Sequence, residues 1–139
     1  MKTLLDTCVL SELQKPRGKA SVRAAVEALP DDDLYLSALT VGELAQGIAQ
    51  LPAGKRKRTL ERWLVALETD HAPRLLPVDA EVARRWGQLN ARLRHEGRPI
   101  PAIDGLLAAT ALAHGLHLMT RNTRDFEPTG VPLLNPWSA

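Results

Sequence analysis

The sequence has one cysteine, few aromatic residues and no long hydrophobic run. A single cysteine, Cys8, excludes an internal disulfide, and without companion Cys and His residues it does not make a structural zinc site. No apolar stretch reaches the roughly 18 residues of a membrane span, and Asp6 interrupts the N-terminal apolar segment where a signal peptide would be continuous. We therefore expect a cytoplasmic protein with no membrane partner.

The remaining composition is that of an ordinary globular protein. The 139 residues are 45% hydrophobic and 24% charged, with a net charge of +2. This length is typical of one domain that buries a core without cross-links, and no linker, repeat or low-complexity segment divides it. We expect a single domain over residues 1–139. The small net charge is too weak to attract nucleic acid over a broad surface, so charge alone does not identify a partner.

Short apolar segments alternate with stretches of helical periodicity along the chain. The pattern predicts strands at 3–5, 34–36, 75–78, 116–120 and 131–134, and helices at 7–13, 19–29, 40–51, 55–69, 79–95 and 102–114. Strands that are apolar on both faces and separated by helices indicate a parallel sheet covered on both sides. The predicted fold class is α/β, a three-layer α/β/α sandwich with a central parallel sheet of four to five strands.

Polar residues with carboxylate or amide oxygens occur where ligands bind in such folds, beyond the carboxyl ends of the strands. Asp6 ends the first strand, Glu43 lies in the first turns of a helix after the second, and Asp104 opens the helix before the fourth. Asn122 and Asp125 follow the fourth strand. Any one of these acids alone fits an ordinary role, because a carboxylate near a helix N-terminus gains roughly 0.3 to 1 kcal/mol from the macrodipole.

Together, the four acids are expected to meet at one edge of the sheet. Two carboxylates about 5 Å apart repel by roughly 3 kcal/mol at an effective dielectric near 20, and such crowding raises their pKa values. A divalent cation removes this penalty, and oxygen ligands suit a hard ion such as Mg²⁺ or Mn²⁺. The same ion can activate water and stabilise charge on phosphoryl oxygens. The pattern therefore favours metal-assisted hydrolysis of a phosphodiester bond.

Four segments of the chain resemble the sequence blocks of PIN-domain ribonucleases, and the resemblance is strongest to the VapC toxins of their FitB-like branch. The segments are LLDTCVLSEL (4–13), LSALTVGELAQGI (36–48), RPIPAIDGLLAATALAHG (98–115) and LMTRNTRDF (118–126). They occur in the family's order, and the terminal NPW (135–137) is similar to that branch as well. Each block alone is modest, whereas four in order are specific.

The resemblance implies a metal-dependent endoribonuclease that uses Mg²⁺ or Mn²⁺ and forms the toxin half of a type II toxin–antitoxin pair. The implied partners are an RNA substrate and a small VapB- or FitA-like antitoxin whose own domain binds operator DNA. A homodimer is expected, within a higher toxin–antitoxin assembly in some members. Neither the RNA nor its cleavage site follows from the sequence.

The family's site residues carry over by position. Asp6 and Asp104 match the two most regular metal-binding aspartates, and Glu43 matches the glutamate that holds the metal directly or through water, or orients the attacking water. The fourth ligand is open between Asp125, an acid, and Asn122, a neutral oxygen donor. The catalytic and metal-binding set is Asp6, Glu43, Asp104 and Asp125, and the substrate-binding candidates are Thr7, Thr120, Arg121, Asn122 and Arg124. For the two arginines an ordinary exposed loop position is about equally expected.

Cys8 departs from the family pattern, which usually has Asn after the Asp-Thr pair. A thiol does not replace both the donor and the acceptor of an amide, so a contact to Asp6 or to substrate is lost or rerouted. A nucleophilic cysteine is the rival interpretation, but no histidine is nearby in sequence, and a small buried residue is favoured.

Three other functions compete with the toxin interpretation. A phosphatase or phosphoryl receiver would also place an Asp after the first strand, but Asp6-Thr7-Cys8 lacks the second Asp of a nucleophile pair. A housekeeping PIN-type RNA-processing nuclease and a non-catalytic PIN-fold binding partner remain. A repulsive carboxylate cluster argues against the non-catalytic partner.

Overall fold

Five short strands form one parallel sheet in the computed structural model, which describes residues 1–138. They are β1 (Thr3–Leu5), β2 (Leu34–Ser37), β3 (Leu75–Leu76), β4 (His117–Met119) and β5 (Leu133–Leu134). Their order across the sheet is β3-β2-β1-β4-β5, and every neighbouring pair is parallel. The chain thus builds outward from β1 in one direction, then returns to add β4 on its other side.

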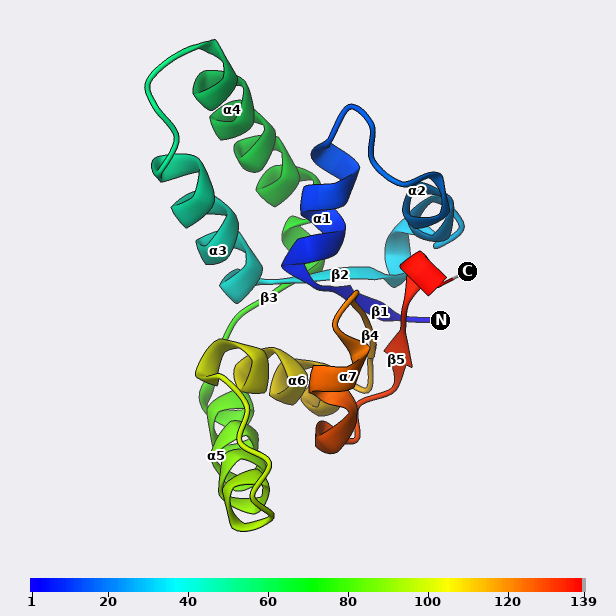
Figure 1. The fold of residues 1–139 in the computed structure, drawn as a ribbon, viewed down its shortest axis with the longest axis vertical. Helices are drawn as coiled ribbons and strands as arrows, with labels where there is room; N and C mark the ends of the chain where they lie inside the picture. The colour runs from blue at the N-terminus through cyan, green and yellow to red at the C-terminus, as the bar shows by residue number, and fades with distance from the viewer. Residues whose placement is uncertain (139) are drawn as a thin grey trace.

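Helices cover both faces of this sheet, as Figure 1 shows. One layer contains α1 (Thr7–Gln14), α2 (Ala20–Glu27), α3 (Ala38–Ala49) and α4 (Lys55–Asp70). The opposite layer contains α5 (Ala80–His95), α6 (Ala102–His114) and the short α7 (Thr123–Phe126). The predicted three-layer α/β/α sandwich with a parallel sheet is confirmed.

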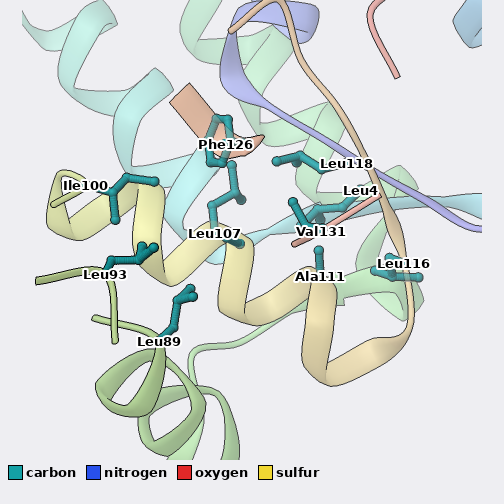
Figure 2. Close-up of a cluster of buried hydrophobic side chains, with 11 residues drawn as sticks. Leu4, Leu89, Leu93, Ile100, Leu107, Ala111, Leu116, Leu118, Phe126 and Val131 are labelled. Atoms are coloured by element: carbon teal, nitrogen blue, oxygen red, sulfur yellow. The ribbon is translucent and has the colours of Figure 1, made fainter. Parts of the chain in front are cut away.

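The strands are apolar on both faces because each contributes to two separate cores. Successive side chains of a strand point to opposite faces, so Leu4 of β1 joins one cluster and Leu5 joins the other. Leu118 and Met119 of β4 divide in the same way. The first cluster lies between the sheet and α5 and α6, where Leu107 projects from its helix toward the sheet (Figure 2). Burial on both sides fixes the sheet in the middle of the molecule.

Several helix boundaries follow from local signals in the sequence. Asp6, Ser37 and Asp79 each precede a helix, and their side chains accept hydrogen bonds from backbone N–H groups in its first turn. Gly115 ends α6 with φ of +66°, a left-handed conformation that favours glycine. No helix in the described part of the chain is both long and apolar enough to cross a membrane.

Some elements differ from the sequence-based expectation. The third strand ends at Leu76 and does not reach Val78, because Pro77 has no N–H to offer the ladder. The residues Asp31–Asp33 form one turn of 3₁₀ helix before β2. The helix α7 was not predicted, since four residues are too few to show helical periodicity.

Candidate active site

Asp6 lies at the centre of the carboxyl edge of the sheet, directly after β1. The strand order reverses between β1 and β4, and crevices at such switch points are where open parallel sheets bind ligands. Asp6 is 7% exposed, and its two carboxylate oxygens have different partners. Oδ1 accepts a hydrogen bond from the backbone N–H of Thr7 at 2.7 Å, and Oδ2 accepts one from the hydroxyl of Thr120 at 2.8 Å. The ends of β1 and β4 are thereby joined at this carboxylate.

Glu43 reaches the same edge from α3, the helix that follows β2. Its Oε1 atom accepts a hydrogen bond of 2.6 Å from the hydroxyl of Thr7. Thr7 therefore contacts two of the predicted carboxylates, Asp6 through its backbone N–H and Glu43 through its side chain. The sequence suggested Thr7 as a substrate contact, and the structure shows that this residue also links two carboxylates.

Asp104 lies in the first turn of α6, on the opposite side of the sheet from α3, and is half-buried. Burial raises the pKa of its carboxyl group, and the negative charges of Asp6, Glu43 and Asp125 raise this pKa further. Asp104 therefore experiences repulsion from all three of the other predicted acids. The acids whose charges act on Asp104 include Asp6 and Asp125, which are 119 positions apart in the sequence.

The donor set suits a hard divalent cation, because it consists of carboxylate and hydroxyl oxygens. Burial is the largest cause of the raised pKa of Asp104, and the negative charges of the other three acids add to it, which a bound cation would offset. Within residues 1–138, however, no three His, Cys, Asp or Glu side chains are placed so that they could hold one ion. The carboxylates of Asp6 and Glu43 are instead hydrogen-bonded to threonine hydroxyls. The oxygen donors of a metal site are thus present in this region, but within residues 1–138 no three acidic side chains are placed around one ion position.

The loop after β4 folds over Thr120. The hydroxyl of Thr120 accepts a hydrogen bond from the backbone N–H of Asn122 at 3.0 Å, and the carbonyl of Asn122 accepts one from Asp125 at 3.0 Å. Asn122, Arg124 and Asp125 are exposed, so their side chains are accessible to a ligand. The charge of Asp125 acts on Asp104, whereas Asn122 is neutral and would offer an amide oxygen.

Cys8 joins α1 to this loop. Its Sγ atom lies 3.7 Å from Oδ2 of Asp6 and 3.8 Å from the hydroxyl of Thr120, and it accepts a hydrogen bond from the backbone N–H of Arg121 at 3.5 Å. Burial raises the pKa of the thiol, and the charge of Asp6 adds to the effect, so the thiol stays protonated at neutral pH and is a poor nucleophile. Where the family usually has an Asn side chain, the sulfur of Cys8 thus contacts Asp6, Thr120 and the backbone N–H of Arg121.

Trp137 lies near the site and was not predicted to do so from the sequence. The exposed Arg121 places its guanidinium over the ring of Trp137, with 5.6 Å between Cζ and the ring centroid. The terminal NPW had been recognised only as a family likeness, and no local signal connects it to a residue 16 positions earlier. Only the proximity of β4 and β5 in the sheet brings the two segments together.

Comparison with known proteins agrees with this fold. The family model described as PIN domain matches residues 3–130. The chain is 41% identical to VapC ribonuclease Y4jK of Sinorhizobium fredii, with 96% of each chain covered. It is 42% identical to toxin FitB of Neisseria gonorrhoeae, covering 96% of this chain and 97% of that one. A solved structure of FitAB bound to a DNA fragment superposes with a TM-score of 0.92 at 38% identity, covering 97% of this chain and 95% of the other.

A match over nearly the whole length, in both sequence and structure, establishes the class. The chain belongs to the PIN-domain family and, within it, to the VapC toxins of the FitB-like branch.

Proposed function

We propose that this chain is a divalent-metal-dependent endoribonuclease that acts as the toxin of a toxin–antitoxin pair in the cytoplasm. The observation that supports the proposal is the environment of Asp104, because its pKa is raised by burial and also by the charges of three acids from separate segments, Asp6, Glu43 and Asp125. The names of the relatives, a VapC ribonuclease and a toxin, support both parts of the proposal.

Asp6 and Asp104 would hold Mg²⁺ or Mn²⁺, with Glu43 and Asp125 completing the ligand set or orienting the attacking water. When bound, such an ion supplies Lewis-acid activation of water and stabilises charge on the phosphoryl oxygens. The hydroxyl of Thr120 fixes the orientation of the Asp6 carboxylate, and the hydroxyl of Thr7 does the same for Glu43.

The substrate would approach from the loop after β4. Arg121, Asn122 and Arg124 are exposed there, beside the carboxylates. An arginine guanidinium presents a planar set of donors that matches phosphate oxygens. These side chains would therefore bind the RNA backbone while the carboxylates act on the scissile phosphate.

Incubation of the purified chain with bacterial total RNA tests the activity. We expect a discrete set of fragments with Mg²⁺ or Mn²⁺ and none in excess EDTA. Because water and not the ribose 2′-hydroxyl is the proposed nucleophile, the fragments should not end in 2′,3′-cyclic phosphate. Equal cleavage in EDTA, or cyclic phosphate ends, would contradict the proposed chemistry.

A groove next to the carboxylates offers a surface for the antitoxin. It has a volume of about 840 Å³ and runs between α1, α3 and α4, with Thr7 and Glu43 at its lining. The apolar residues that line it are Leu44, Ile48, Leu51, Leu60 and Trp63. We propose that an amphipathic segment of a FitA-like antitoxin occupies this groove, as the existence of a FitAB complex on DNA suggests.

Gly47 provides a test of this docking surface. It lines the groove, and no atom lies within 4 Å of the position that a Cβ would take. Gly47→Arg should therefore fill the groove without disturbing α3 and should prevent co-purification of a co-expressed FitA-like antitoxin. Gly87→Arg, at an equally open position of α5, is the matched control and should leave co-purification unchanged. If the antitoxin co-purified with both variants, it would bind a surface other than this groove.

A further inference from the structure

The C-terminal segment Asn135–Trp137 is fixed against α2. The side chain of Lys19 donates a hydrogen bond to the carbonyl of Trp137 at 2.9 Å, and the hydroxyl of Ser21 donates one to the carbonyl of Pro136 at 2.7 Å. The side-chain oxygen of Asn135 accepts a hydrogen bond from the backbone N–H of Trp137 at 2.9 Å. In Figure 1 this segment, drawn in red, lies below α2 and beside the end of β5. These bonds hold the backbone of the segment, and the indole of Trp137 packs against the hydrophobic cluster that contains Leu5 and Met119.

Arg121 extends from the carboxylate edge to this indole. Its backbone N–H contacts the sulfur of Cys8, and that sulfur lies 3.7 Å from the Asp6 carboxylate. Its guanidinium stacks on Trp137. An exposed arginine ordinarily samples many rotamers, and stacking on a fixed ring reduces that freedom before any ligand binds. Arg121 is thus preorganised at the rim of the site.

Glu12 of α1 is close to Arg121 and to Lys15. Glu12 of α1 accepts hydrogen bonds from the backbone N–H of Lys19 at 2.8 Å and from the ammonium of Lys15 at 3.1 Å. These contacts lower the pKa of Glu12, and the nearby charge of Arg121 adds to the effect. The Glu12 carboxylate thus has two cationic side chains near it, Lys15 and Arg121, whereas Lys19 contributes its backbone N–H and directs its ammonium to the carbonyl of Trp137. A basic rim beside an acidic site is suited to a polyanion that must reach that site.

We propose that Trp137 is a positioning residue that holds the Arg121 guanidinium on the basic rim, where Arg121 binds a phosphate of the RNA flanking the scissile bond. This inference rests on the proposed ribonuclease function and deepens it. The RNA strand passes from the carboxylates over Arg121 toward the turn between α1 and α2. That turn is closely packed, since a Cβ at Gly18 would overlap the carbonyl oxygen of Glu12.

Trp137 also packs against the hydrophobic cluster that contains Leu5 and Met119, so a loss of stability alone would not demonstrate positioning. A double-mutant cycle on RNA affinity separates the two roles. Positioning requires that the effect of Trp137 on RNA binding depend on Arg121. A purely structural role predicts the same effect with or without that guanidinium.

The measurement uses the full chain carrying Asp6→Asn, which should bind RNA without cleaving it, and records the affinity for a fluorescent single-stranded RNA. Trp137→Leu should weaken binding about two- to five-fold, the factor expected for one exposed cation–π contact. Trp137→Phe should restore most of this loss because it keeps an aromatic face.

Two further variants complete the test. Arg121→Gln should weaken binding about ten-fold and lower the slope of log affinity against log salt by roughly 0.7. In that background Trp137→Leu should have no additional effect. Arg121→Lys, which does not disturb the core, should also lower the RNA affinity about two- to five-fold. The lysine keeps the positive charge but lacks the planar set of donors of the guanidinium.

The possible failures are distinguishable. An Asp6→Asn parent that binds no RNA would overturn the proposed function and this inference with it. Two results would overturn the inference alone. In the first, the Asp6→Asn parent and its Trp137→Leu variant bind RNA equally tightly. In the second, Trp137→Leu weakens binding by the same factor when Arg121→Gln is already present. Should Trp137→Leu fold poorly, Trp137→Met, which keeps a large apolar side chain but has no aromatic face, takes its place in the same cycle with Arg121→Gln.

Discussion

Asp104→Asn should abolish RNA cleavage, with a loss of about a thousandfold or more. The carboxylate is one of two principal candidates to hold the catalytic ion, and the amide that replaces it is neutral and has only one acceptor oxygen. Asp6→Asn should have a comparable effect, because Asp6 lies at the end of β1 in the same acidic group. Initial rates on a defined RNA, with Mg²⁺ in excess, provide the measurement.

Asp79→Asn is the matched control for these substitutions. Asp79 caps α5 as Asp6 caps α1, through a side-chain oxygen that accepts a backbone N–H, and Asn serves equally well at such a position. Asp79 is not among the groups that raise the pKa of Asp104. The control should retain full activity. Cleavage that persisted in both Asp6→Asn and Asp104→Asn would refute the assignment of the site.

Without metal, Asp104→Asn should also be as stable as the wild type or more stable at neutral pH. The pKa of Asp104 in the folded protein lies above its ordinary value of 3.8. Between these two values the folded protein binds a proton that the unfolded chain has lost, so the stability of the wild type falls as the pH rises through this window and stays lower above it. The advantage of the variant should therefore shrink as the pH falls toward 3.8, which unfolding in urea with EDTA can measure.

Mn²⁺ should raise the melting temperature of the wild type by roughly 5 to 10 °C at a concentration of about 100 Kd. Binding to the folded state alone stabilises by about 2.7 kcal/mol at that concentration, and this free energy corresponds to such a shift for a domain of this size. The cation also relieves the repulsion that raises the pKa of Asp104. Asp104→Asn should lose most of the shift. Differential scanning fluorimetry over a range of Mn²⁺ concentrations gives both values.

Asp79→Asn again provides the control and should shift as the wild type does. An identical shift in wild type and Asp104→Asn would mean that the ion binds at another place. Because the readout is stability, this experiment tests the metal site without reference to any RNA. It would therefore remain informative if the chosen RNA were a poor substrate.

The sequence predicted most of the secondary structure because its signals are local. The strand Thr3–Leu5 and the helix Ala102–His114 have the predicted bounds, since an apolar run before Asp6 and a glycine after His114 mark their ends. The helix α7 and the early end of β3 were missed, because a single turn has no period and a two-residue strand is set by its neighbours. Elements long enough to show a hydrophobic pattern can be predicted from the sequence, whereas features of two to four residues generally cannot.

The candidate acids could be chosen from their places after strands, but their partners could not. The hydrogen bond from Thr120 to Asp6 joins residues 114 positions apart, and the bond from Thr7 to Glu43 spans 36 positions. Nothing in either local sequence indicates these pairs. They exist because β1 lies between β2 and β4, an order that depends on how the helices cover the sheet.

By itself, the sequence determined an α/β protein with a parallel sheet, helices on both faces and acids at one edge, because hydrophobic periodicity and chain order carry that information. The tertiary structure alone decided that Cys8 contacts Asp6 and that the guanidinium of Arg121 lies over the ring of Trp137. Such contacts depend on the packing of segments that are remote in the chain, and their energies are only a few kcal/mol or less. No local propensity encodes them, so they become visible only when the whole chain is folded.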